Sequence, residues 1–191
     1  AATLLSERPR PLRFCYAAPV FRQQTQSHAE WRRENTQLGC ELIGTGGKPA
    51  DLEVLRLAAE ILSRLNLQSR YCITINNVEI FNGVAAHLNL EERAREQLRR
   101  LIDTRETAEL QRFLKNYPDA HAFSQPAQLT GKRNVIEAAR NSITNARSVA
   151  ALDSLEDLWT EIESLGFENS FEIDLGDVSS LDYYTGVSLK I

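Results

Sequence analysis

Three side chains near the start of the chain have types and spacing suited to binding a small charged molecule. Arg22 ends the segment APVFR, and Gln37 and Glu41 lie four residues apart in the segment QLGCE. An arginine guanidinium can bond a phosphate group through two N–H groups at once. An amide and a carboxylate suit a small cationic ligand such as an amino acid.

The spacing of Gln37, Gly39 and Glu41 determines where their side chains point if this segment is a strand. Side chains alternate across a strand, so these three residues share one face. Gly39 has no side chain, and the pattern therefore predicts open space between the amide and the carboxylate. The same spacing also fits an ordinary solvent-facing side of a strand. From the residues alone, both interpretations stay open.

Two strands must position these residues. We expect strands near 12–21 and 37–43, because both segments are rich in apolar residues and flanked by proline or glycine. The polar segment between them is too long for a tight turn and is typical of a functional loop. The following GTGGKP lacks the GxxxxGK[ST] spacing of a phosphate-binding loop, so we interpret it as a turn. The apolar spacing after it predicts a helix over 50–66.

The rest of the chain is predicted to contain both helices and strands. Apolar periodicity predicts a strand over 71–75, helices over 78–88, 91–102, 107–116, 133–146 and 154–165, and strands over 170–175 and 182–190. Strands at both ends with helices between them favour an α+β fold. We predict one antiparallel sheet with strands near 12–21, 37–43, 170–175 and 182–190, helices outside it, and a helical insertion over roughly 78–150. The charged run in 91–102 is interpreted as a solvated helix face.

Composition limits the classes of function. The 191 residues carry a net charge of -4, which shows no overall basic footprint for nucleic acid. No apolar run is long enough to span a membrane. The chain contains no methionine, so we expect it to be a piece of a longer translation product.

Cysteine and histidine give no sign of a metal site. Cys15, Cys40 and Cys72 lack CxxC spacing, which predicts reduced thiols of a cytoplasmic protein and, most simply, small core residues. The three histidines, His28, His87 and His121, lie too far apart to form a ligand motif. We therefore predict neither a metal nor a cofactor.

Two motifs resemble a known family. The segment LRFCYAAPVFRQQTQSHAEWRRENTQLGCELIG resembles the second signature motif of class II aminoacyl-tRNA synthetases of the histidyl type, which reads roughly Y-x-G-P-x-F-R-x-E, loop, Q-x-G-x-E-x-x-G. SSLDYYTG resembles the histidyl signature R-G-L-D-Y-Y-T, and RRLIDTRETAELQRFL resembles a stretch of the family's regulatory paralogues. The motifs occur in the family's order. The resemblance implies that 1–191 is a fragment of one class II catalytic-core domain.

The resemblance also implies roles for individual residues. Arg22 matches the arginine that binds the α-phosphate of ATP, and Gln37 matches the glutamine that holds the amino-acid backbone. Glu41 and Tyr184 match the pair that recognises the imidazole ring. The implied histidine-binding set is Gln37, Glu41, Tyr183 and Tyr184.

Other positions depart from the family pattern. Ser179 and Ser180 stand where the family has its catalytic arginine and the following glycine, Gln24 replaces a glutamate, and Ala18 replaces a glycine. A serine cannot stabilise developing phosphate charge as an arginine does. The resemblance therefore implies a protein without catalytic residues, which binds histidine without activating it, with Arg22 as a vestigial nucleotide-phosphate residue.

The resemblance, with its retained histidine-binding residues and its replaced catalytic residues, also implies a function. It implies a regulatory subunit of ATP phosphoribosyltransferase, the enzyme that catalyses the first step of histidine biosynthesis. The implied partners are the short-form catalytic subunit and histidine for feedback control, with a homodimer inside a hetero-oligomer, no membrane and no tRNA. The alternative is a histidyl-tRNA synthetase, an enzyme that charges tRNA. A third possibility is a histidine-binding module with another partner.

Overall fold

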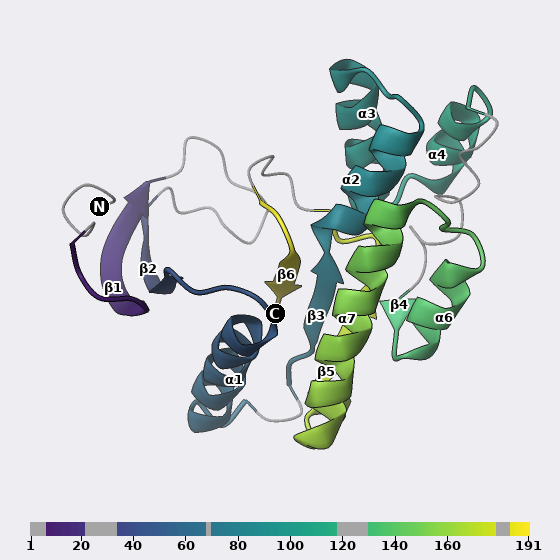
Figure 1. Cartoon of the computed structure of the whole chain (residues 1–191). Helices are drawn as coiled ribbons and strands as arrows, with labels where there is room; N and C mark the ends of the chain where they lie inside the picture. Colours follow the sequence, from purple (N-terminus) through teal and green to yellow (C-terminus); the bar gives the residue numbers. More distant parts are fainter. Residues whose placement is uncertain (1–6, 22–33, 68–69, 118–129, 179–183) are drawn as a thin grey trace. The chain divides into compact units, whose positions relative to one another are not determined.

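The computed structural model describes residues 7–21, 34–67, 70–117, 130–178 and 184–191. The chain divides into two compact units, Ala1–Leu57 and Ala58–Ile191. Figure 1 shows the elements of both units in sequence colours. No helix in the described residues is long and apolar enough to cross a membrane.

The first unit is built on a hairpin. Strand β1 (Leu12–Phe21) pairs antiparallel with β2 (Glu34–Ile43), from Leu12 opposite Ile43 to Phe21 opposite Glu34. Helix α1 (Lys48–Arg64) follows a glycine turn and begins in this unit. Pro49 suits the first helical turn, where the missing N–H would have no partner, and Asp51 favours the helix N-terminus by its charge. The predicted hairpin strands and the helix predicted over 50–66 are confirmed.

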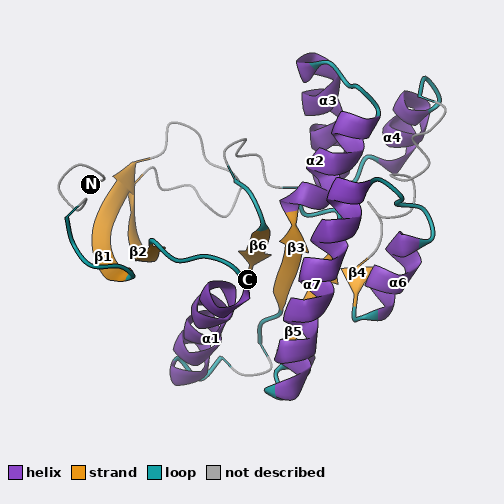
Figure 2. Ribbon diagram, viewed as in Figure 1, coloured by secondary structure: helices purple, strands orange, loops and turns teal. Residues whose placement is uncertain are grey.

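The second unit contains a four-stranded mixed sheet (Figure 2). Its order is β4 (Thr130–Gly131), β5 (Phe171–Asp174), β3 (Ile73–Asn77) and β6 (Val187–Lys190). β3 runs parallel to β5 and antiparallel to β6. The predicted strands β5 and β6 do share one sheet, but β3 lies between them and runs parallel to β5, so the sheet of this unit is mixed and not purely antiparallel. The prediction that the hairpin strands join the same sheet stays a prediction.

Local physics explains the central position of β3. Ile73 and Ile75 are fully buried, as expected for a strand with neighbours on both edges and packing on its face. A long helical connection leads from β3 to β5, and such crossovers join parallel strands. The strand predicted over 71–75 exists, but its central role was not visible in the short apolar run.

Helices fill the connection between β3 and β5. They are α2 (Val78–His87), α3 (Glu92–Asp103), α4 (Thr107–Leu114), α6 (Asn134–Arg140) and α7 (Ala146–Ser164), followed by the 3-10 turn η2 (Glu168–Ser170). The helix predicted over 133–146 ends earlier, and the helix predicted over 154–165 begins earlier. Asn145 is the reason, because its side-chain oxygen accepts from the Ser148 N–H at 2.9 Å and caps α7. The insertion predicted over 78–150 stays a prediction.

Helices α2 and α7 pack side by side, as Figure 1 shows. Gly83 on α2 permits the close approach, since a Cβ there would lie 2.3 Å from Ser148 Oγ and 2.8 Å from the Ser148 backbone nitrogen. The Ser148 hydroxyl donates to the Ile80 carbonyl at 2.7 Å across the same contact. Buried apolar side chains from α7, including Leu155 and Trp159, complete the core.

Among the described residues of the second unit two charged side chains are buried, and the first of them differs from the sequence interpretation. Arg99 on α3 is buried, not on a solvated face, and its guanidinium lies 5.3 Å from the centre of the Phe81 ring. Asp177 is also buried and forms an ion pair with Lys190 of β6. Its carbonyl accepts from the Asn76 amide at 3.0 Å. These contacts attach β6 to β3 and to the turn after β5.

Candidate functional site

The register of the hairpin separates two faces. Gln37, Gly39 and Glu41 lie opposite Ala18, Tyr16 and Phe14 respectively. Residues directly opposite each other in an antiparallel pair project to the same side, so these six residues form one surface, here named the Gln37 face. The prediction that Gln37, Gly39 and Glu41 share a face is confirmed.

The space beside Gly39 is occupied, which corrects the expectation of a gap. The ring of Tyr16 covers Gly39 so closely that an added Cβ would lie 2.2 Å from Tyr16 Cζ. The Gln37 amide nitrogen donates to the Tyr16 hydroxyl at 3.1 Å. An aromatic ring opposite a strand glycine is a common way to fill the missing side-chain volume. Sequence reasoning missed Tyr16, although its place opposite Gly39 follows once the hairpin register is known.

Glu41 lies at the end of the Gln37 face nearest to α1. Its side chain is exposed, and within the described residues it has no hydrogen bond or ion pair. Phe14 lies opposite it in the register and is 40% exposed. A carboxylate beside an accessible aromatic ring is available to accept a hydrogen bond from a cationic or N–H-bearing ligand.

The other side of the hairpin, here named the Arg13 face, contains Arg13, Cys15, Ala17, Leu38, Cys40 and Leu42. Arg13 donates twice to the Glu53 carboxylate of α1, through Nε at 2.5 Å and Nη2 at 2.7 Å. These bonds lower the pKa of Glu53, and the bond to Glu53 raises that of Arg13. The forked pair connects the hairpin to α1 and leaves the Gln37 face open.

A hollow of about 230 Å³ lies between the hairpin and the start of α1. It is lined by Arg13, Phe14, Cys15, Cys40, Glu41, Leu42, Glu53, Val54 and Leu57. Both hairpin cysteines are exposed free thiols, and so is Cys72. The expectation of reduced thiols stays a prediction, and the expectation that the cysteines are core residues was wrong. A two-stranded hairpin has no second layer on its own to bury them.

The remaining predicted residues cannot be placed together. Tyr184 is 45% exposed and belongs to the second unit, whereas Gln37 and Glu41 belong to the first. A pocket shared by Glu41 and Tyr184 therefore stays a prediction. Arg22, Tyr183 and Ser179 lie outside the described residues.

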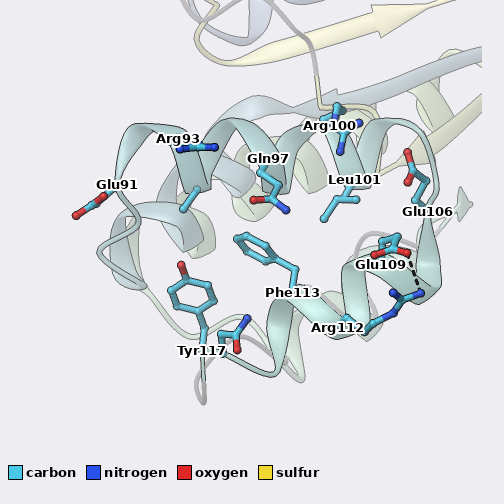
Figure 3. A pocket seen from close by; sticks show the side chains of 12 residues that line it. Glu91, Arg93, Gln97, Arg100, Leu101, Glu106, Glu109, Arg112, Phe113 and Tyr117 are labelled. Atoms are coloured by element: carbon cyan, nitrogen blue, oxygen red, sulfur yellow. Dashed lines mark ion pairs between the residues drawn. The ribbon is translucent and has the colours of Figure 1, made fainter.

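A second hollow, of about 680 Å³, lies between α3 and α4 (Figure 3). Arg93, Gln97 and Arg100 of α3 face it, and Phe113 and Tyr117 line it from α4 and the residues after it. The two rings lie 5.2 Å apart between centres. Carboxylates line it as well, one of them, Glu109, paired with Arg112 at 2.7 Å. The lining is therefore mixed in charge and does not by itself select an anion or a cation. Sequence reasoning gave no signal for this hollow.

Among the residues that the structure describes, no group of three or more His, Cys, Asp or Glu side chains could hold a metal ion. The site chemistry that the described residues offer is hydrogen bonding by an amide, a phenol and a carboxylate on the Gln37 face.

Comparison with known proteins identifies the family. The model of the histidyl-tRNA synthetase family matches residues 1–191. The chain belongs to the histidyl-tRNA synthetase family. A curated relative, the ATP phosphoribosyltransferase regulatory subunit of Syntrophotalea carbinolica, is 32% identical over 99% of the chain and 45% of its own length. The chain thus spans about half the length of the curated relatives it matches.

Solved structures of family members agree with the fold. A structure from Bacillus halodurans C, described as an ATP phosphoribosyltransferase regulatory subunit/histidyl-tRNA synthetase, matches with a TM-score of 0.85 and 31% identity, over 98% of this chain and 49% of that one. The ATP phosphoribosyl transferase (HisG:HisZ) complex from Thermotoga maritima matches with a TM-score of 0.68 and 18% identity, over 98% of this chain and 67% of that one. The predicted α+β fold of the class II synthetase type is confirmed.

Proposed function

We propose that the chain is core sequence of a regulatory subunit required for ATP phosphoribosyltransferase activity, which starts histidine biosynthesis. The observation that carries the proposal is similarity over nearly the whole chain to curated regulatory subunits, at 32% identity in two of them. The partner we propose is the short-form catalytic subunit, in a hetero-oligomer that contains a homodimer of this protein. A cytoplasmic location, without membrane or tRNA as partner, belongs to the same proposal.

The ligand we propose is histidine, bound for feedback control. Gln37 would hold the amino-acid backbone, and Glu41, Tyr183 and Tyr184 would recognise the ring. A carboxylate and a phenol can bond the two nitrogens of an imidazole, one as acceptor and the other as donor or acceptor. Within the described residues the Glu41 carboxylate on the Gln37 face is exposed and has no ion pair, which supports this role.

The protein is proposed to lack aminoacylation chemistry. Ser179 stands at the position that the family motif gives to its catalytic arginine. One preorganised cation or hydrogen-bond donor placed at a developing charge lowers the activation free energy by roughly 2.7–4 kcal/mol. The alternative, a histidyl-tRNA synthetase, is kept because the matching family is named for that enzyme. Histidine-dependent pyrophosphate exchange by the full-length protein would favour the enzyme over the regulator.

The partner is tested by co-purification. The full-length protein should co-purify with a short-form phosphoribosyltransferase and raise its activity, and added histidine should lower the activity of the complex. Activity of the catalytic subunit that does not depend on this protein would reject the regulatory proposal. Activation that histidine does not change would retain the subunit role and reject the feedback role.

The ligand is tested by calorimetry on variants of the full-length protein. Glu41→Ala should weaken histidine binding by roughly ten-fold or more, since a hydrogen bond to a charged group contributes about 1.5–3 kcal/mol. Glu41→Gln should lose less, because its amide still accepts one bond. Arg22→Ala is the matched control, since its proposed role is nucleotide phosphate. Equal histidine affinity of Glu41→Ala and the wild type would reject Glu41 as a ligand residue.

A further inference from the structure

Tyr16 and Gln37 form one hydrogen-bonded unit on the Gln37 face. The amide nitrogen of Gln37 donates to the Tyr16 hydroxyl at 3.1 Å. The two residues come from different strands and are offset by one side-chain step, because Tyr16 lies opposite Gly39 and Gln37 lies opposite Ala18. Within the described residues, neither side chain forms a hydrogen bond with a third side chain.

In the structure this bond leaves the oxygen end of the Gln37 amide free. A glutamine amide has one donor end and one acceptor end, and rotation by half a turn exchanges them. With its nitrogen engaged by Tyr16, Gln37 leaves its oxygen Oε1 available as an acceptor. A carbonyl oxygen suits the ammonium group of an amino acid, whereas an amide nitrogen in the same place would repel it.

Gly39 makes the arrangement possible. The Tyr16 ring lies over the Gly39 backbone, and any Cβ would come within 2.2–2.5 Å of three of its atoms, Cζ, the hydroxyl oxygen and Cε1. The ring is 41% exposed, so the hairpin itself does not enclose it. Gly39 therefore leaves room for the ring in this position, from which the Tyr16 hydroxyl reaches the nitrogen end of the Gln37 amide.

We propose that Tyr16 is a positioning residue that orients Gln37 toward the α-ammonium group of an amino-acid ligand. The inference rests on the proposed function, because it takes histidine as the ligand. In this proposal Tyr16 does not contact the imidazole ring of the ligand. It acts through Gln37, and it contributes to selection of an α-amino acid over an otherwise similar acid that lacks the amino group.

The test uses two ligands and the full-length protein. L-Histidine carries the α-ammonium group, and 3-(imidazol-4-yl)propionate lacks it. Calorimetry should show that Tyr16→Phe weakens histidine binding about 2- to 10-fold, the range for one hydrogen bond. The affinity for the propionate should not change. Phenylalanine keeps the ring over Gly39, so the thermal midpoint should stay close to that of the wild type.

A double-mutant cycle identifies the route of the effect. In a Gln37→Ala background, Tyr16→Phe should cause no further loss of histidine affinity, because no amide remains to be oriented. Equal losses for both ligands, an additive second loss, or unchanged histidine affinity in Tyr16→Phe would each overturn the inference. If the wild-type protein does not bind histidine, the proposal that histidine is the ligand is rejected. That result is separate from the role of Tyr16, which the variants test.

Discussion

The two units of the chain differ in how far their side chains are exposed to solvent. In the hairpin, most residues of both strands are exposed, including Leu38 at 77% and Phe21 at 72%. In the second unit, β3, β5 and α7 contribute side chains such as Leu155 and Ile173 that are fully buried. The candidate ligand-binding residues Gln37 and Glu41 lie on the open hairpin, and the buried apolar side chains lie mostly in the other unit. A two-stranded ribbon is marginal alone, so the stability of the chain should depend mostly on the second unit.

The largest expected contrast is between two leucines. Leu155→Ala on α7 should lower the free energy of unfolding by about 2–5 kcal/mol, because it removes buried methyl groups and leaves a cavity. Leu38→Ala on the hairpin should stay within about 0.5 kcal/mol of the wild type, since Leu38 is 77% exposed. Chemical denaturation of both variants measures the difference. Equal losses would mean that the Arg13 face is covered in solution.

Two glycines make the next comparison. An alanine at Gly83 would meet backbone and side-chain atoms of Ser148, so the helices α2 and α7 would have to separate. The cost should be about 1–3 kcal/mol, more than the gain of up to about 1 kcal/mol in helix propensity. An alanine at Gly39 would meet only the end of the Tyr16 side chain, which can rotate away.

Gly39→Ala should therefore leave the unfolding free energy almost unchanged and reduce histidine affinity instead. Thermal unfolding and calorimetry on the same pair of variants separate the two effects. A stable Gly83→Ala variant would contradict the close approach of α2 and α7. Unfolding caused by Gly39→Ala would mean that the hairpin has a rigid neighbour on this face.

The smallest expected difference between the two units is in how ion-paired carboxylates make stability depend on pH. In the second unit, Glu79 accepts from Arg147 at 2.5 Å and from Asn82 at 2.9 Å. The bond from Arg147 is the main reason why the pKa of Glu79 is lowered. A carboxyl with a lowered pKa in the folded state contributes stability above its unfolded pKa, near 4.3, and loses it as the pH falls through the folded value.

In the wild type, the unfolding free energy should fall as the pH drops below about 4.3, because the Glu79 carboxylate is protonated. Glu79→Gln should reduce this fall by roughly 0.2–1 kcal/mol at low salt. Glu53→Gln is the matched control in the hairpin unit, where Arg13 lowers the pKa of a carboxyl that is more exposed. Its effect should be smaller and should disappear at higher salt. Denaturation curves at several pH values test both. A larger effect for Glu53 would reverse the expected order.

The sequence predicted local features of both units better than their long-range pairing. Periodic apolar residues located α1, α2 and α3 closely, because apolar residues recur at helical spacing in each of these segments. The boundary between α6 and α7 was missed, since Asn145 acts as a cap only if the chain turns before it. The position of β3 between β5 and β6 was also missed, because the sequence of a five-residue strand carries no information about its neighbours.

The candidate site shows the same limit at the level of single residues. Strand alternation was enough to place Gln37, Gly39 and Glu41 on one face. It could not show that Tyr16 fills the space over Gly39, because that depends on the register between two strands that are not adjacent in the sequence. The burial of Arg99 against Phe81 was missed for a similar reason, since the charged run around it fits a solvated helix.

The register of the hairpin has a consequence for handling the protein. Cys15 lies directly opposite Cys40 on the Arg13 face, and both thiols are free and exposed. Cβ atoms of directly opposite residues are about 4.5–5.5 Å apart, close to the range from which a disulfide can form with small adjustment. Diamide or air could therefore crosslink the two strands within one molecule and lower the mass by two hydrogen atoms. A single bifunctional thiol reagent could likewise place a fluorophore on the hairpin, on the side away from Gln37.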